Sequence, residues 1–133
     1  EHEVSINDSG KVAFIGQWTI STTSLESVFV GAGLSDPIHI SGFPGSRNFA
    51  NGVQITNSNR VAARDLISGA SFIRIWGPNA EDYDDIARGV TGAHFDSVIA
   101  RPSVNNLGQV VFSALKDRRL SWSPPIRSLD STN

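Results

Sequence analysis

The sequence predicts an all-β fold made of tandem four-stranded antiparallel units of about 49 residues, with little or no helix. Three observations predict it. One segment recurs twice at equal spacing, and short β-branched and aromatic runs are bounded by Asn, Asp and Gly. In addition, no stretch places apolar residues at i, i+3 and i+4 over the length that a helix needs.

The recurring segment is ten residues long, and its copies are Ser5–Phe14, Gln54–Ala63 and Ser103–Phe112. Corresponding residues are 49 positions apart at both steps. Two equal intervals without a gap indicate a tandem repeat. The sequence therefore predicts one domain with two complete units, 4–52 and 53–101, followed by a truncated third unit, 102–133.

Each copy of the segment predicts a β-hairpin. A β-branched residue closes one strand, an Asn or Asp side chain bonds to the backbone two residues on, and Gly or Asn adopts positive φ. The turn residues are Asn7, Asp8, Gly10, Asn57, Asn59, Asn105, Asn106 and Gly108. The second strands are predicted at Val12–Ile15, Val61–Ala63 and Val110–Phe112.

Weaker similarities extend the unit to four strands. Third strands are predicted at Ser27–Gly31, Ser71–Gly77 and Leu120–Trp122, and short fourth runs at Pro37–Ile40, Asp85–Arg88 and Pro125–Ser128. Phe49 and Phe95 each precede the next hairpin, where their side chains are expected to pack one unit against its neighbour. Residues 42–46 and 81–85 are predicted loops, and residues 129–133 are expected to be frayed.

The hairpin segment resembles the bacterial NxxGxxAF repeat of exported, cyanobacterial-type surface proteins. Asn7–Phe14 fits that signature fully, and Asn105–Phe112 fits with Val111 in place of Ala. The middle copy carries Thr56, Asn59 and Ala63 at the Asn, Gly and Phe positions, so a less regular hairpin is expected there. The resemblance implies a β-propeller-like architecture and an extracellular or envelope location, whereas the activities of such proteins are mostly unassigned.

Units of four short strands and this length are also typical of propeller blades, and a closed propeller needs about 4 to 8 of them. Two units and a part cannot close a ring alone. The chain is thus a fragment, an open array of β-repeats, or one of several copies that complete each other. Because the truncated unit leaves an unpaired strand edge, we expect a homo-oligomer formed by edge-strand completion.

Composition narrows the function. Of 133 residues, 39% are hydrophobic and 18% are charged, which indicates a globular chain, and the net charge of −2 favours neither nucleic acid nor an anionic membrane as a partner. No apolar run is long enough for a membrane span. With no Cys and no Met, including at position 1, the sequence predicts an exported protein with a processed N-terminus, located extracellularly or on the cell surface.

No motif indicates catalysis, a cofactor or a metal. His2, His39 and His94 lack a second ligand at metal spacing and are expected on the surface. The acidic cluster around Tyr83 (Glu81, Asp82, Asp84 and Asp85) lacks the alternation of a calcium loop and is interpreted as a solvated loop. The glycine-rich runs 31–33 and 42–45 lack the lysine and following helix of a phosphate-binding loop.

Three tryptophans, Trp18, Trp76 and Trp122, are the speculative ligand-stacking residues. Tryptophans near strand ends can stack on sugar rings, and they also pack in cores and between units. The leading interpretation is a non-enzymatic, self-assembling structural protein of a bacterial surface or extracellular matrix, which forms rings or filaments. The alternative is a propeller module that binds carbohydrate or protein through these tryptophans. A hydrolase would need convergent polar groups that the sequence does not show.

Overall fold

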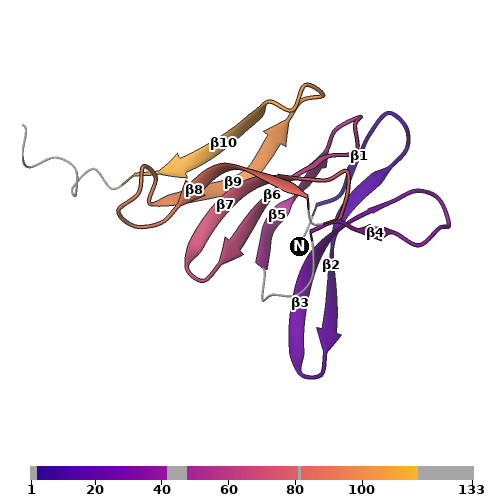
Figure 1. Cartoon of the computed structure of the whole chain (residues 1–133), viewed down its shortest axis with the longest axis horizontal. Coiled ribbons are helices and arrows are strands. Elements are labelled where there is room, and N and C mark those ends of the chain that lie inside the picture. Colours follow the sequence, from indigo (N-terminus) through magenta and orange to yellow (C-terminus); the bar gives the residue numbers. More distant parts are fainter. Residues whose placement is uncertain (1–2, 42–47, 81, 117–133) are drawn as a thin grey trace, which may run out of the picture.

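The computed structural model describes residues 3–41, 48–80 and 82–116, and these residues form antiparallel strands without any helix (Figure 1). The predicted all-β antiparallel fold is confirmed. Sheet A holds β1 (Ser5–Ile6), β2 (Val12–Ile20), β3 (Thr23–Gly31) and β4 (Ile38–His39). Sheet B holds β5 (Asn48–Ile55), β6 (Val61–Ile67), β7 (Ala70–Trp76) and β8 (Tyr83–Gly89). Sheet C holds β9 (Ser97–Val104) and β10 (Val110–Leu115).

Within each sheet, strands that follow one another in the chain are neighbours. Sheets A and B are therefore simple up-and-down meanders of four strands, and the described part of sheet C is one hairpin. The third and fourth strands predicted for the last unit, at Leu120–Trp122 and Pro125–Ser128, lie outside the described residues. None of the described residues belongs to a helix that could cross a membrane.

Two predicted boundaries were wrong. Strands β2 and β3 continue to a tight turn at 21–22, because Thr19, Ile20 and Thr23 are β-branched and pair across the extended hairpin. Ser21 takes a left-handed φ of 56° there. Residues 83–85, predicted as part of a loop, begin β8, because β7 offers backbone partners and Arg74 lies directly opposite Asp85.

The main core lies between sheets A and B. The alternation of the strands turns one apolar face of each sheet toward the other. The buried residues of this core are Ala13, Val28, Val30 and Ile40 from sheet A and Phe49, Val53, Ile55, Val61, Ala63 and Trp76 from sheet B. Phe49 is fully buried between the sheets, as predicted for the residue that packs one unit against the next.

Sheet C packs on the opposite face of sheet B, so sheet B lies between its two neighbours (Figure 1). The residue that corresponds to Phe49 in this second interface is Val98, which is 49 positions further along and also fully buried. Phe95, which was also predicted for this role, pairs through its backbone with Gly89 at the end of β8 and accepts the N–H of Val90 at 3.0 Å. Its ring precedes β9 and packs edge-on against Phe112, with 5.9 Å between the ring centroids.

The close approach of β8 to β9 depends on Gly89. A Cβ atom at this position would lie 2.4 Å from the backbone nitrogen of Val98, so we expect Gly89→Ala to destabilise the protein by about 1–3 kcal/mol through overpacking. At Gly16 the nearest atoms belong to the Phe29 ring, which can shift. Gly16→Ala is therefore the control and should cost clearly less in urea unfolding. Equal losses for the two variants would contradict the proposed packing at Gly89.

Candidate functional site

The turns of the three hairpins have one bonding pattern, and we call them together the turn row: Asn7–Gly10, Thr56–Asn59 and Asn105–Gly108. The N–H of each first residue donates to the carbonyl of the residue after the turn, with N···O distances of 3.0, 2.8 and 3.1 Å in chain order. The N–H of each fourth residue donates to the carbonyl of the first residue at 3.0 Å. The fourth residues have positive φ, as predicted: 79° at Gly10, 63° at Asn59 and 80° at Gly108.

The middle turn is as regular as the other two, contrary to expectation. In the outer turns, the side-chain Oδ1 of Asn7 and of Asn105 accepts the N–H of the residue that follows the turn, at 2.9 and 3.0 Å. Thr56 does the same with its hydroxyl, since Oγ1 accepts the N–H of Arg60 at 3.1 Å. A hydroxyl one bond from Cβ thus replaces the amide oxygen without changing the turn.

Side chains of the turn row bond from one sheet to the next. The N–H of Asp8 donates to Oδ1 of Asn57 at 3.0 Å, and the N–H of Asn57 donates to Oδ1 of Asn106 at 2.8 Å. These residues are 49 positions apart, so the same bond occurs at both steps. In addition, Nδ2 of Asn57 donates to Oδ2 of Asp8 at 2.6 Å, and Nδ2 of Asn7 donates to the carbonyl of Thr56 at 3.0 Å.

A second series of bonds serves the first strand of each following sheet. The outer edges of β5 and β9 have no strand partner among the described residues, and their N–H groups need acceptors. The hydroxyl of Ser5 accepts the N–H of Ile55 at 3.2 Å, and Oε1 of Gln54 accepts the N–H of Val104 at 3.1 Å. Ser5 and Gln54 are again 49 residues apart. They occupy the first position of the repeated segment, and this shared position is the signal from which the sequence could have predicted their common role as acceptors.

The other end of these two edges is bonded in a comparable way. Oε2 of Glu26, on β3, accepts the N–H of Phe49 at 2.7 Å, and the hydroxyl of Ser71, on β7, accepts the N–H of Val98 at 2.9 Å. Neither Glu26 nor Ser71 was predicted as an acceptor from the sequence, because the two residues differ in type and are 45 residues apart. Sheets A and B therefore each provide acceptors from two of their strands to the open edge of the next sheet.

An ionic cluster crosses sheet B. The Arg74 guanidinium donates through Nη1 to Oδ2 of the fully buried Asp65 at 2.7 Å and through Nε to Oδ1 of Asp85 at 2.5 Å. The Arg74 cation also lies over the Tyr83 ring, 4.4 Å from its centroid. Burial by itself lowers the pKa of Arg74, but hydrogen bonds and charge from Asp85 and Asp65 outweigh burial and raise the pKa above its ordinary value. The Arg74 guanidinium therefore stays positively charged within this ionic cluster.

The structure places the predicted acidic residues and histidines differently. Asp84 pairs with Arg60 at 2.5 Å and Asp85 with Arg74, whereas Glu81 lies outside the described residues. His39 was expected on the surface and is instead half-buried, with its ring stacked on Phe29 at 5.0 Å between centroids. His94 is exposed, as expected, and His2 lies outside the described residues.

Trp76 does not form a ligand platform. Its side chain is fully buried and contacts the Phe49 and Tyr83 rings, with 6.3 and 4.6 Å between the ring centroids. The prediction of ligand stacking at Trp76 was wrong, because the alternation of β7 turns this residue toward sheet A. The side chain of Trp18 and the whole of Trp122 lie outside what the structure describes, so stacking by those two residues stays a prediction.

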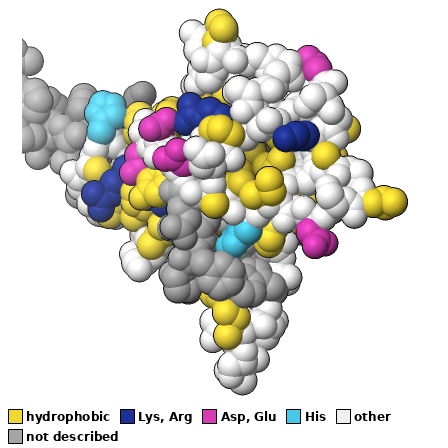
Figure 2. Space-filling view, turned by 45° about the vertical axis from the view of Figure 1, so that its right-hand side comes forward, with side chains coloured by type: hydrophobic (Ala, Val, Ile, Leu, Met, Phe, Trp, Pro, Cys, Tyr) yellow, Lys and Arg dark blue, Asp and Glu magenta, His cyan; other side chains and the backbone are white. Residues whose placement is uncertain are grey.

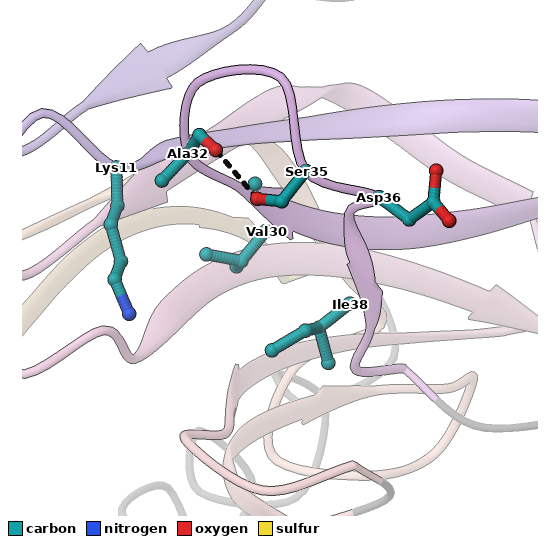
Figure 3. Close-up of a pocket in the computed structure, with 7 residues that line it drawn as sticks. Lys11, Val30, Ala32, Ser35, Asp36 and Ile38 are labelled. Atoms are coloured by element: carbon teal, nitrogen blue, oxygen red, sulfur yellow. Dashed lines mark hydrogen bonds between the residues drawn. The ribbon is translucent and has the colours of Figure 1, made fainter.

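A shallow hollow of about 110 Å³ lies beside the glycine-rich turn 31–33 (Figure 3). Lys11 and Asp36 flank it from opposite sides, and Val30 and Ile38 line it between them (Figure 3). The hydroxyl of Ser35 donates to the carbonyl of Ala32 at 2.7 Å and holds the turn in place. The polar side chains that line the hollow are Lys11, Ser35 and Asp36, and the Ser35 hydroxyl is engaged by this backbone carbonyl.

Asn57 and Asn106 provide a matched test of the turn row. In Asn57→Asp, a carboxylate faces that of Asp8 and the donor of the 2.6 Å bond is lost, so the variant should unfold more easily than the unaltered chain at about pH 7. In Asn106→Asp the acceptor for Asn57 N–H is kept, and urea unfolding should be nearly unchanged. Similar losses in both variants would contradict this geometry.

The ionic cluster gives a second test. Arg74→Met leaves the Asp65 carboxylate buried without its cation and should cost about 3–5 kcal/mol in urea unfolding. Adding Asp65→Leu should recover most of this loss, because the uncompensated charge is then removed. The control is Arg88→Met, which removes an exposed cation 5.7 Å from the centroid of the Phe72 ring but no buried ion pair, and it should change stability by no more than about 1 kcal/mol. The cluster is not structural if the double variant remains as unstable as the single one.

Comparisons of this chain with protein-family models, with curated proteins and with solved structures found no match. The resemblance to the NxxGxxAF repeat therefore stays a prediction from the sequence.

Proposed function

We propose that this chain is a non-enzymatic structural protein in which four-stranded units stack on one another and whose copies assemble into a ring or filament. The observation that carries the proposal is the turn row, in which the backbone of one hairpin bonds to a side chain of the next, twice over and with corresponding residues. Repeat proteins whose units contact mainly their neighbours can be extended by the same contacts.

Sheets A, B and C follow one another at the predicted spacing, but the predicted unit boundaries 52/53 and 101/102 fall inside β5 (Asn48–Ile55) and β9 (Ser97–Val104), because the strand before each hairpin turn belongs to the same sheet as that hairpin. Strands β1, β5 and β9 end 49 residues apart, and so do the starts of β2, β6 and β10. In the β5/β6 pairing the register shifts between the pairs Ala50–Arg64 and Val53–Ala63. In the β9/β10 pairing it shifts at the corresponding place, between the pairs Ile99–Ser113 and Ser103–Val111. Propeller-like blades and an open array both fit this organisation, since both stack sheets face to face.

Completion of the third unit by a neighbouring chain stays a proposal, because the predicted third strand Leu120–Trp122 lies outside the described residues. Strands β2 and β6 each pair on both sides, whereas β10 pairs only with β9 in the described part of the sheet. A strand from another copy could add to this edge through main-chain hydrogen bonds.

The side chains favour this structural role over the alternative of a binding module. Trp76 is buried, so a carbohydrate or protein platform would have to rest on Trp18 and Trp122. The charged groups Arg60, Arg74 and Asp84 are held in ion pairs on sheet B. We further propose that the protein acts outside the cell, on a bacterial surface or in an extracellular matrix, and the sulfur-free composition and the repeat resemblance support this location.

The proposal predicts concentration-dependent assembly. Purified protein should show light scattering that rises faster than its concentration, and negative-stain electron microscopy should show rings or filaments. A monodisperse monomer at high concentration would contradict the proposed function. Binding on a glycan array, accompanied by quenching of tryptophan fluorescence, would instead support the binding module.

A further inference from the structure

Sheets A, B and C pack in chain order, and the outer faces of sheets A and C are exposed although the equivalent faces between the sheets are buried. On sheet C, Val111 is 74% exposed, whereas the corresponding residues Ala62 and Ala13 are fully buried against the next sheet. At the other end, Ile6 on sheet A is 67% exposed, whereas the corresponding Ile55 is 8% exposed because sheet A covers it. Among the described residues, no sheet covers the outer side of sheet C or the outer side of sheet A, whereas the corresponding sides inside the row are covered by the adjacent sheet.

We name these surfaces by their residues. The C-terminal face is the outer side of β10, with Val111, Ser113 and Leu115, which are all exposed in strict alternation with half-buried residues. The N-terminal face is the side of sheet A turned away from sheet B, with Ile6, Val12, Phe14 and Phe29, which share one side by strand register. Figure 2 brings the sheet A end forward and shows hydrophobic side chains exposed there.

The polar groups of the two faces are complementary. Ser103 is the third member of the series in which Ser5 and Gln54 accept the N–H of the next sheet's first strand, and it is exposed. The matching donor on a second copy is the N–H of Ile6. It points away from β2, because Asn7 N–H bonds toward that strand and successive N–H groups alternate in direction.

The turn row can continue in the same way. Asn57 N–H donates to Asn106 Oδ1, and the next donor in the series is the N–H of Asn106. The group of a second copy that corresponds to the accepting amide oxygen is the carboxylate of Asp8. Its Oδ2 binds Asn57 of its own chain, which leaves Oδ1 for an incoming N–H. A carboxylate accepts such a bond more strongly than an amide does.

The apolar parts of the faces also fit. The N-terminal face contains a hollow of about 210 Å³ lined by Val12, Phe14 and Pro37, which offers an apolar surface to an incoming side chain. On the C-terminal face, Val111 and Leu115 project from the strand that would lie over it. A contact of this kind continues the packing already present between sheets A and B.

We propose that copies of this chain associate head to tail, with the C-terminal face of one copy stacked on the N-terminal face of the next. This inference rests on the proposed function, since it names the interface through which the assembly forms. Because the two faces differ, the contact is heterologous, so it closes into a ring or runs on as a filament. It joins sheets face to face and does not require strand addition at the β10 edge.

The test uses one charged substitution on each face, Val111→Lys and Ile6→Lys, both at exposed positions. Each variant alone should remain folded by circular dichroism and should need at least about tenfold more protein for half-assembly, because a buried lysine would lack a partner. The control Ile86→Lys changes an apolar residue of sheet B that is 41% exposed and lies on neither face, and it should assemble like the unaltered chain.

Mixing the two variants gives the decisive result. Val111→Lys keeps an intact N-terminal face and Ile6→Lys keeps an intact C-terminal face, so an equimolar mixture should form dimers and nothing larger in analytical ultracentrifugation. If either variant fails to fold, Leu115→Lys replaces it on the C-terminal face and Phe14→Lys on the N-terminal face. Full assembly by both single variants overturns the head-to-tail contact while the proposed function stands. Failure of the unaltered chain to assemble overturns the proposed function itself.

Discussion

The outer edges of β5 and β9 impose the requirement on which the rest of the structure depends. A strand at the edge of a sheet presents unpaired N–H groups, and shielding them from water without an acceptor costs free energy and destabilises the fold. Here the preceding sheet supplies the acceptors, from Ser5 and Glu26 to β5 and from Gln54 and Ser71 to β9. These bonds require the sheets to lie face to face in chain order and at a constant offset.

The ionic cluster shows how the same packing shapes a single sheet. A small antiparallel sheet is marginal in water, and it becomes stable when one face is covered. Sheet B is covered on both faces, so a charge within it needs partners. Arg74 finds them in Asp65 and Asp85, and its bond to Asp85 accompanies the pairing of the acidic segment with β7 as part of β8. A run that would otherwise be a solvated loop is thereby ordered.

The contacts that hold adjacent sheets together also determine which groups are exposed on the first and last sheets. When the contacts are made by local groups of each hairpin, the last sheet of a row presents the same groups as the sheets before it, and the first sheet presents their complements. The described chain has this property at Ser103 and Asn106 on one end and at Ile6 and Asp8 on the other. These groups are the reason for our proposal of a structural protein that extends by stacking.

The sequence by itself determined the all-β class, the hairpins and their spacing, because Asn at the start of a turn and Gly or Asn at its end act through bonds within five residues. Only the tertiary structure decided which residues contact one another between adjacent sheets. Thr56 keeps the middle turn regular, Val98 is the buried counterpart of Phe49 in the second interface, and Trp76 is buried. Such outcomes depend on which face of one sheet covers the next, and groups that meet only after folding leave no local pattern in the chain.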